Sequence, residues 1–123
     1  KIVEPSEEIK ESYINKSKNS LKSAKILLEN DQVENAVPMA YYSMYNMLTA
    51  LLFKVGIKCE NHSASIIILK ELFGLDNSKI SSAKTERVDK QYSERASLGI
   101  FYHRCNWRRR ISFVCCCSKY NFW

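Results

Sequence analysis

Residues that interrupt helices are scarce in this sequence, which has three glycines and two prolines among 123 residues. This scarcity excludes collagen-like and proline-rich chains, and a composition of 46% hydrophobic and 26% charged residues argues against a disordered chain. A chain of this length can build one hydrophobic core but not two independent ones. We therefore expect one compact domain.

Long apolar runs are also missing. No stretch approaches the roughly 20 apolar residues that a membrane span requires, and the N-terminal residues lack the apolar core of a signal peptide. We therefore expect a cytoplasmic protein without membrane contact.

Cysteine is nearly absent from the first 95 residues, where Cys59 is the single thiol. One thiol cannot form a disulfide scaffold, and no Cys-x-x-Cys pair occurs in the chain. The remaining cysteines, at 105 and 115–117, include three adjacent ones that cannot easily all reach one tetrahedral centre. We expect no metal site and no cofactor.

Acidic residues are absent from residues 96–123, which supply +5 of the net charge of +6. Basic-residue usage reverses there as well, from twelve Lys and two Arg in residues 1–95 to one Lys and four Arg. Two interpretations remain open: a genuine basic tail, with Trp107 and Arg108–Arg110 as a phosphate-binding patch, or a shifted reading frame. We divide the chain into a body, 1–95, and an atypical basic, Cys-rich tail, 96–123.

Apolar periodicity predicts two long helices at the start of the body. Ser6 and the acidic residues after it favour a first helix over 6–30. Its inward positions are Ile9, Tyr13, Ser17, Leu21, Ala24 and Leu28. Asp31 and Glu34 suggest a capping box that starts a second helix, which runs to about Val55 and is bent near Pro38. Gly56 is a natural stop.

Two shorter helices are expected to follow. Asn61-His62-Ser63 caps a third helix that ends before Gly74, with inward positions at Ala64, Ile67, Ile68, Leu72 and Phe73. Asp76-Asn77-Ser78 caps a fourth over 78–95. There we expect Ile80, Ala83, Val88 and Tyr92 to face inward and Lys84, Glu86 and Lys90 to face water. The fold class is therefore all-α, an up-and-down antiparallel four-helix bundle with the tail as an additional C-terminal segment.

The segment AYYSMYNMLTALLFKVGI, residues 40–57, is followed by Asn61-His62-Ser63 and a stripe ending in Leu72-Phe73. Over about residues 12–92 this pattern resembles the HEPN family, specifically its small stand-alone archaeal and bacterial members. The resemblance implies an up-and-down bundle and two functional settings. Many HEPN domains pair with a minimal nucleotidyltransferase in toxin–antitoxin modules, and many are metal-independent ribonucleases with a motif of Arg, four to six residues, then His.

That ribonuclease motif is missing from the body. No Arg precedes Arg87, and seven residues separate Arg95 from His103. The matching stretch of the fourth helix holds Arg87, Gln91 and Tyr92, and an amide such as Gln91 cannot act as a base near pH 7. Tyr92 also resembles the tyrosine that the partner enzyme nucleotidylates in some modules. We assign no catalytic residue.

Arg87, Gln91 and Tyr92 are candidate contacts to a ligand or RNA; the alternative is a solvated Arg beside a core Tyr. Tyr41, Tyr42 and Tyr45 are candidate core or interface residues, with base stacking as the alternative. For His62 we favour a hydrogen-bonding role at the helix start over metal binding.

These features suggest a non-catalytic HEPN-like interaction module that is the partner of a nucleotidyltransferase and binds nucleotide or RNA. The alternative is a metal-independent ribonuclease with altered catalytic residues. Because the second helix is apolar around more of its circumference than one core face needs, we also expect a homodimer through the first two helices.

Overall fold

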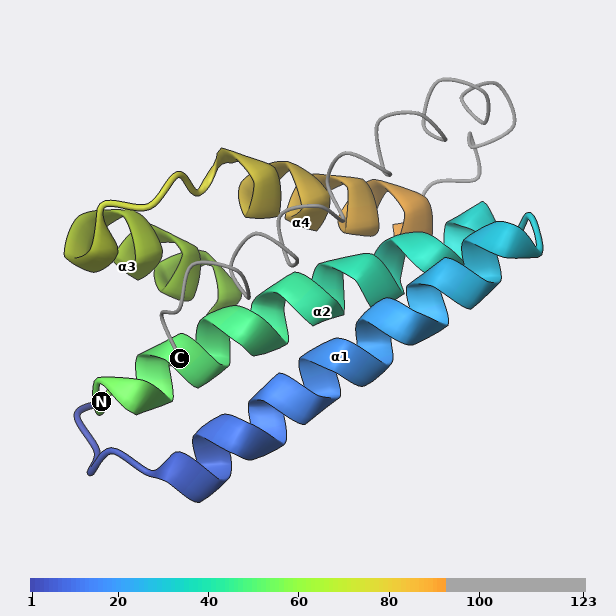
Figure 1. The fold of residues 1–123 in the computed structure, drawn as a ribbon. Coiled ribbons are helices and arrows are strands. Elements are labelled where there is room, and N and C mark those ends of the chain that lie inside the picture. Colours follow the sequence, from blue (N-terminus) through green and yellow to red (C-terminus); the bar gives the residue numbers. More distant parts are fainter. Residues whose placement is uncertain (93–123) are drawn as a thin grey trace.

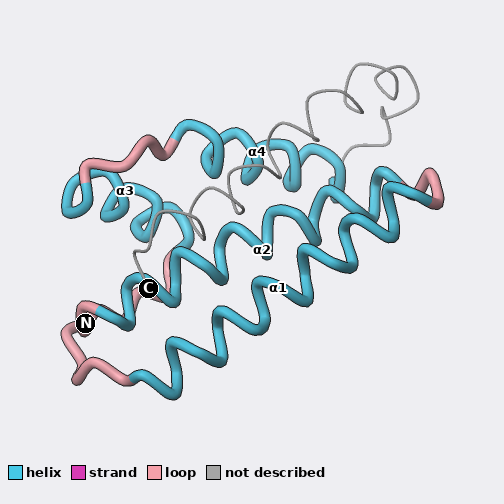
Figure 2. Tube along the Cα trace, viewed as in Figure 1, coloured by secondary structure: helices cyan, strands magenta, loops and turns pink. Residues whose placement is uncertain are grey.

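A computed structural model describes the backbone of residues 1–92 and the side chains up to Asp89. Four helices occur in this part of the chain: α1 (Glu7–Glu29), α2 (Val33–Lys54), α3 (His62–Phe73) and α4 (Ser78–Tyr92). Short connections join them (Figure 2). The expected all-helical bundle is confirmed, whereas the tail, 96–123, lies outside the described residues.

The central element is α2. The antiparallel helix α1 packs along one side of it, and α3 and α4 lie on the other side, with α4 antiparallel to α2 (Figure 1). A helix covered on several sides needs apolar residues around its whole circumference. The excess apolar character of α2, from which we expected a dimer, is thus accounted for within one chain.

Helix α2 supplies much of the core, since Leu48 and Leu51 are buried in one cluster with residues of all four helices. Small residues allow α1 and α2 to approach closely: Ala24 of α1 is buried, and Ser17 donates a hydrogen bond to the carbonyl oxygen of Ser43 at 2.8 Å. Tyr13 stacks on Phe53 further along the same contact, with ring centroids 5.6 Å apart.

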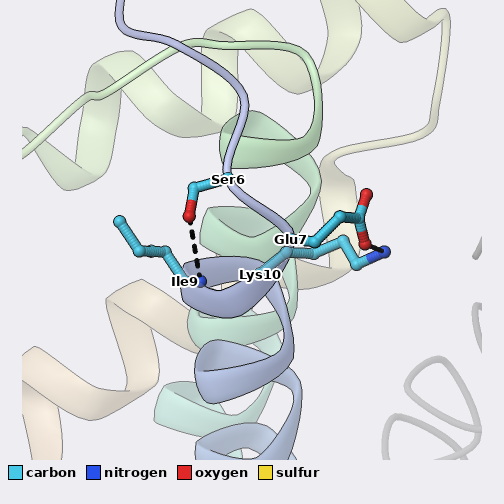
Figure 3. A network of polar contacts seen from close by, with 4 residues as sticks. All are labelled: Ser6, Glu7, Ile9 and Lys10. Carbon is cyan, nitrogen blue, oxygen red and sulfur yellow. Dashed lines mark hydrogen bonds and ion pairs between the residues drawn. The ribbon is translucent and has the colours of Figure 1, made fainter.

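The start of α1 follows the sequence expectation. The Ser6 hydroxyl accepts a hydrogen bond from the backbone N–H of Ile9 at 3.3 Å, and Glu7 forms an ion pair with the largely buried Lys10 (Figure 3). Ile9, however, is exposed rather than inward.

The α1–α2 connection differs from the expected capping box. Asp31 has a left-handed backbone, φ 59°, and the N–H of Gln32 bonds to the carbonyl of Leu27 at 2.8 Å. This geometry closes the C-terminal end of α1, so Asp31 ends α1 instead of capping α2. The residue at the N-cap of α2 is Gln32, whose side chain makes no cap hydrogen bond. The helix then continues through Pro38 to Lys54.

Gly56 ends α2, as expected, with φ 75°. Its carbonyl accepts a hydrogen bond from the N–H of Val3 at 2.8 Å, so the N-terminal residues lie against the α2–α3 connection. A Cβ atom at Gly56 would lie 2.6 Å from the Val3 carbonyl oxygen. The position requires glycine for both its backbone conformation and its space.

The face of α3 was predicted only in part, since Ile68 and Phe73 are partly buried against the core. Its caps are as expected, with the Asn61 side chain accepting from the Ala64 N–H at 3.0 Å and Gly74 left-handed. The buried positions, however, are Ser65, Ile66 and Leu69, whereas Ile67 and Leu72 are 58% and 61% exposed. Three consecutive isoleucines, 66–68, fit several faces equally well, and contact with α2 selects the face that holds Ile66.

The inward face of α4 also needs correction. Ile80 and Ala83 are buried as predicted, but Val88 is exposed. The row of inward residues at spacings of three and four continues instead from Ala83 to Arg87. Lys84 and Glu86, which were expected to face water, are half-buried. Helix α4 is fixed to α3 by Asn77, whose side chain donates to the Ile66 carbonyl at 3.1 Å. The side chains of Lys90, Gln91 and Tyr92 lie outside the described part.

Candidate functional site

Polar and aromatic side chains from three helices meet on the side of α2 that faces α3 and α4. Tyr41, Tyr42 and Tyr45 come from α2, His62 is the first residue of α3, and Arg87 comes from α4. We call these five residues the aromatic–arginine cluster. It exists because Tyr41 and Tyr45 are one turn apart on α2, and because α4 turns Arg87 inward.

Tyr41 and His62 form the buried centre of the cluster. The Tyr41 side chain is fully buried, and its hydroxyl lies 2.6 Å from His62 Nδ1. Burial raises the pKa of Tyr41 to about 12, despite an opposing effect of Arg87. Burial first, then the positive charges of Arg87 and Lys84, lower the pKa of His62. Since Tyr41 keeps its proton and His62 stays neutral, we assign the hydroxyl as the donor and Nδ1 as the acceptor.

The rings around His62 are stacked. The His62 and Tyr45 rings are nearly parallel, with centroids 3.8 Å apart, and the Tyr41 ring lies 6.1 Å from that of Tyr45. Asn61 caps α3 directly before His62. The imidazole is therefore held by a hydrogen bond, a ring face and a capped helix start.

Arg87 contacts the same aromatic group. Its Nη1 donates to the Tyr42 hydroxyl at 3.0 Å, and its guanidinium carbon lies 5.0 Å and 5.5 Å from the ring centres of Tyr41 and Tyr42. These distances are typical of cation–π contacts. The Arg87 Nε is buried and has no hydrogen-bond partner in the described part of the chain.

Two cations, Arg87 and Lys84, contribute positive charge at the cluster. Lys84 hydrogen-bonds to Ser63 in the first turn of α3, and both Lys84 and Arg87 lower the pKa of His62. No acidic residue occupies the first turn of α3, whose N–H groups add a partial positive charge. Anions are therefore favoured next to these rings.

The sequence indicated the members of this cluster only separately. Tyr41, Tyr42 and Tyr45 were candidates for core or interface, Arg87 for ligand contact and His62 for local hydrogen bonding. Their meeting depends on tertiary packing, since Tyr41 and His62 are 21 positions apart in the sequence and Tyr42 and Arg87 are 45 positions apart. The side chains of the other two ligand candidates, Gln91 and Tyr92, lie outside the described part.

Two further observations concern groups other than the cluster. Among the residues that the structure describes, no three His, Cys, Asp or Glu side chains are arranged to hold a metal ion. None of the four described helices combines the length and apolarity that spanning a bilayer requires.

Comparison with known proteins supports the family assignment. The model of the HEPN domain matches residues 10–104, and the chain therefore belongs to the HEPN domain family. A UPF0332 protein of Pyrococcus horikoshii is 37% identical over 82 residues, covering 67% of this chain and 54% of the relative. One of Thermotoga maritima is 30% identical over 98 residues, covering 80% of this chain and 63% of the relative.

The chain thus spans somewhat more than half the length of these two curated relatives. No solved structure matches the chain significantly.

Proposed function

We propose that this chain is a non-catalytic HEPN interaction module whose aromatic–arginine cluster binds the phosphate of a nucleotide or an RNA. The observation that carries the proposal is the position of the Arg87 guanidinium beside Tyr42 and next to the stacked Tyr45 and His62 rings. Cations beside aromatic rings suit a ligand that has both a phosphate and a base.

The hydrogen bonds within the cluster favour binding over catalysis. His62 is the one side chain of the cluster that ordinarily titrates near neutral pH, and its Nδ1 is already bonded to the Tyr41 hydroxyl. One face of its ring is also covered by Tyr45. An imidazole held in this way has less freedom to approach a ribose hydroxyl, as acid–base cleavage requires.

The proposal is tested by measuring how ATP and a fluorescent single-stranded RNA bind to the Arg87→Ala variant. We expect at least tenfold weaker binding, because the variant loses a charge-assisted contact worth about 1.5–3 kcal/mol. The matched control is Lys70→Ala, which removes an exposed cation of α3 and should change affinity less than twofold. Unchanged binding by a folded Arg87→Ala protein would contradict the proposal.

We further propose that the module acts with a minimal nucleotidyltransferase in a toxin–antitoxin-type system and forms a homodimer. The family resemblance supports the nucleotidyltransferase partner, and the half-buried Tyr42 and Tyr45 of α2 offer a surface for the homodimer. The test is calorimetric titration of this protein with the nucleotidyltransferase encoded beside its gene. A neighbouring nucleotidyltransferase that fails to bind would count against this partner.

The second candidate is a metal-independent ribonuclease with altered catalytic residues. It is favoured by the position of Arg87 and His62, which both contact Tyr41 although the sequence motif is missing. This candidate predicts RNA cleavage that is lost in both His62→Gln and Arg87→Ala. The binding module predicts no cleavage above background in the unmodified protein.

A further inference from the structure

The outer surface of α1 has an unusual charge distribution. Residues 12–28 contain four lysines and no acidic residue, whereas the carboxylates of this helix lie at its ends, at Glu7, Glu8, Glu11 and Glu29. The lysines are Lys16, Lys18, Lys22 and Lys25, and all four are exposed.

Lys18, Lys22 and Lys25 form a row along one side of α1, which we call the lysine row. At 100° and 1.5 Å per residue, the three positions fall within about 60° of one another and extend about 10 Å along the helix axis. Each cation lies three or four residues from the next, so the row presents its charges on one continuous strip of surface.

The row does not serve the stability of α1. Like charges at these spacings destabilise a helix by about 0.2–0.5 kcal/mol per pair. The last turn of α1, where cations would favour the helix dipole, contains no basic residue. Within residues 1–89, no hydrogen bond or ion pair engages the row, whereas Lys10 pairs with Glu7. An external anion would relieve this repulsion.

We infer that the lysine row binds the phosphodiester backbone of single-stranded RNA without regard to sequence. Lysine binds phosphate as a point charge, and three such contacts in a line match a chain of phosphates rather than a single one. Asn15 and Asn19 lie exposed on the same side of α1 and can donate to phosphate or sugar oxygens.

Other anionic partners fit this surface less well. Insertion into a membrane surface requires a free apolar face, but that face of α1, with Ile14 and Ala24, is packed against α2. Protein interfaces have an apolar core that is depleted of lysine, and the only large apolar side chains exposed on α1 are Ile9 and Ile26.

The inference does not depend on the proposed function of the aromatic–arginine cluster. Helix α2 lies between α1, which carries the row, and the helices α3 and α4, which carry His62 and Arg87 of the cluster (Figure 1). An effect of the row on RNA binding can therefore be measured whether or not Arg87 contributes.

The experiment uses the full chain and a fluorescein-labelled uridine 15-mer, with anisotropy recorded at several NaCl concentrations. Substituting Lys18→Gln, Lys22→Gln and Lys25→Gln together should lower the slope of log K against log [salt] by about 2, because each phosphate contact contributes about 0.7. Affinity at 0.1 M salt should fall at least tenfold. Replacing the same three lysines by Arg should preserve the slope.

The matched control carries Lys58→Gln, Lys70→Gln and Lys79→Gln, which change net charge equally at positions outside α1. It should keep the slope within about 0.7 of the unmodified protein. Equal losses in both triple variants, or none in the α1 variant, would overturn the inference. The inference would also be overturned if binding to phosphatidylglycerol vesicles depended on the lysine row while binding to the RNA did not. Adding Arg87→Ala to the α1 variant separates this effect from that of the cluster.

Discussion

At the scale of single residues, the contact between Tyr41 and His62 joins the first turn of α3 to the middle of α2. Burial keeps both groups neutral, and Arg87 and Lys84 oppose a positive charge on the imidazole. The Tyr41 hydroxyl can donate to Nδ1 only while that nitrogen carries no proton. The contact therefore links the docking of α3 to the protonation state of one side chain.

Protonation of His62 should destabilise the fold. Because the pKa of His62 is lower in the folded protein than its ordinary value of 6.5, the unfolded chain takes up the proton first as the pH falls. The stabilising contribution of His62 is present above pH 6.5 and is lost below it. We expect urea unfolding to show a larger loss of stability between pH 7.5 and 5 in the unmodified protein than in His62→Gln. Equal losses would show that other groups cause the dependence.

At the scale of elements, the glycines that end α2 and α3 form a natural matched pair. Both have a positive φ. A Cβ atom added at Gly56 would clash with the Val3 carbonyl oxygen, whereas one added at Gly74 would have no atom within 4 Å. Gly74→Ala should cost about 1 kcal/mol for the left-handed backbone alone. Gly56→Ala should cost at least about 1 kcal/mol more, because backbone must move to admit the methyl group. Thermal unfolding checks the order, and a larger loss in Gly74→Ala would contradict this account.

The buried face of α2 gives a second test at this scale. Leu48→Ala should lower the free energy of unfolding by roughly 2–5 kcal/mol, because it removes apolar contacts and leaves a cavity. Ile67→Ala on the exposed side of α3 should stay within about 0.5 kcal/mol of the unmodified protein. Denaturant midpoints measure both, and similar midpoints for the two variants would show that the core is misassigned.

The sequence predicts the helices better than their faces. Caps such as Ser6 and Asn61 and stops such as Gly56 act through local backbone chemistry, so helix ends can be recognised without knowing the fold. The orientation of α3 and α4 depends on contact with α2. On α4, Arg87 lies four residues after the buried Ala83 and Val88 lies five residues after it, and packing against the tyrosines of α2 shows that Arg87 is the inward residue. The aromatic–arginine cluster could not be predicted for the same reason.

At the scale of the whole molecule, the central position of α2 changes the basis for the expected homodimer. The apolar circumference that suggested an interface is covered within the chain, and Tyr41 is fully buried there. Tyr42 and Tyr45 are half-buried. They are therefore the two predicted interface residues whose side chains a second copy of the chain could contact.

Light scattering at micromolar concentration tests the assembly. We expect the mass of a dimer and a shift toward the monomer in Tyr42→Ala or Tyr45→Ala, because these half-buried tyrosines of α2 are the interface candidates. Ile67→Ala, on the exposed side of α3 and outside the first two helices, is the control and should not change the mass. A monomer mass for the unmodified protein would rule out the homodimer at that concentration.

The hydrogen bond from Ser17 to the Ser43 carbonyl has a consequence for the relative alignment of α1 and α2. Both serines are fully buried, and a slide of α1 by one turn, 5.4 Å, would leave the hydroxyl among apolar side chains without an acceptor. The alignment is thus set in the middle of the helical hairpin and not by its connection. Residues inserted after Asn30 should lengthen the loop without shifting one helix past the other.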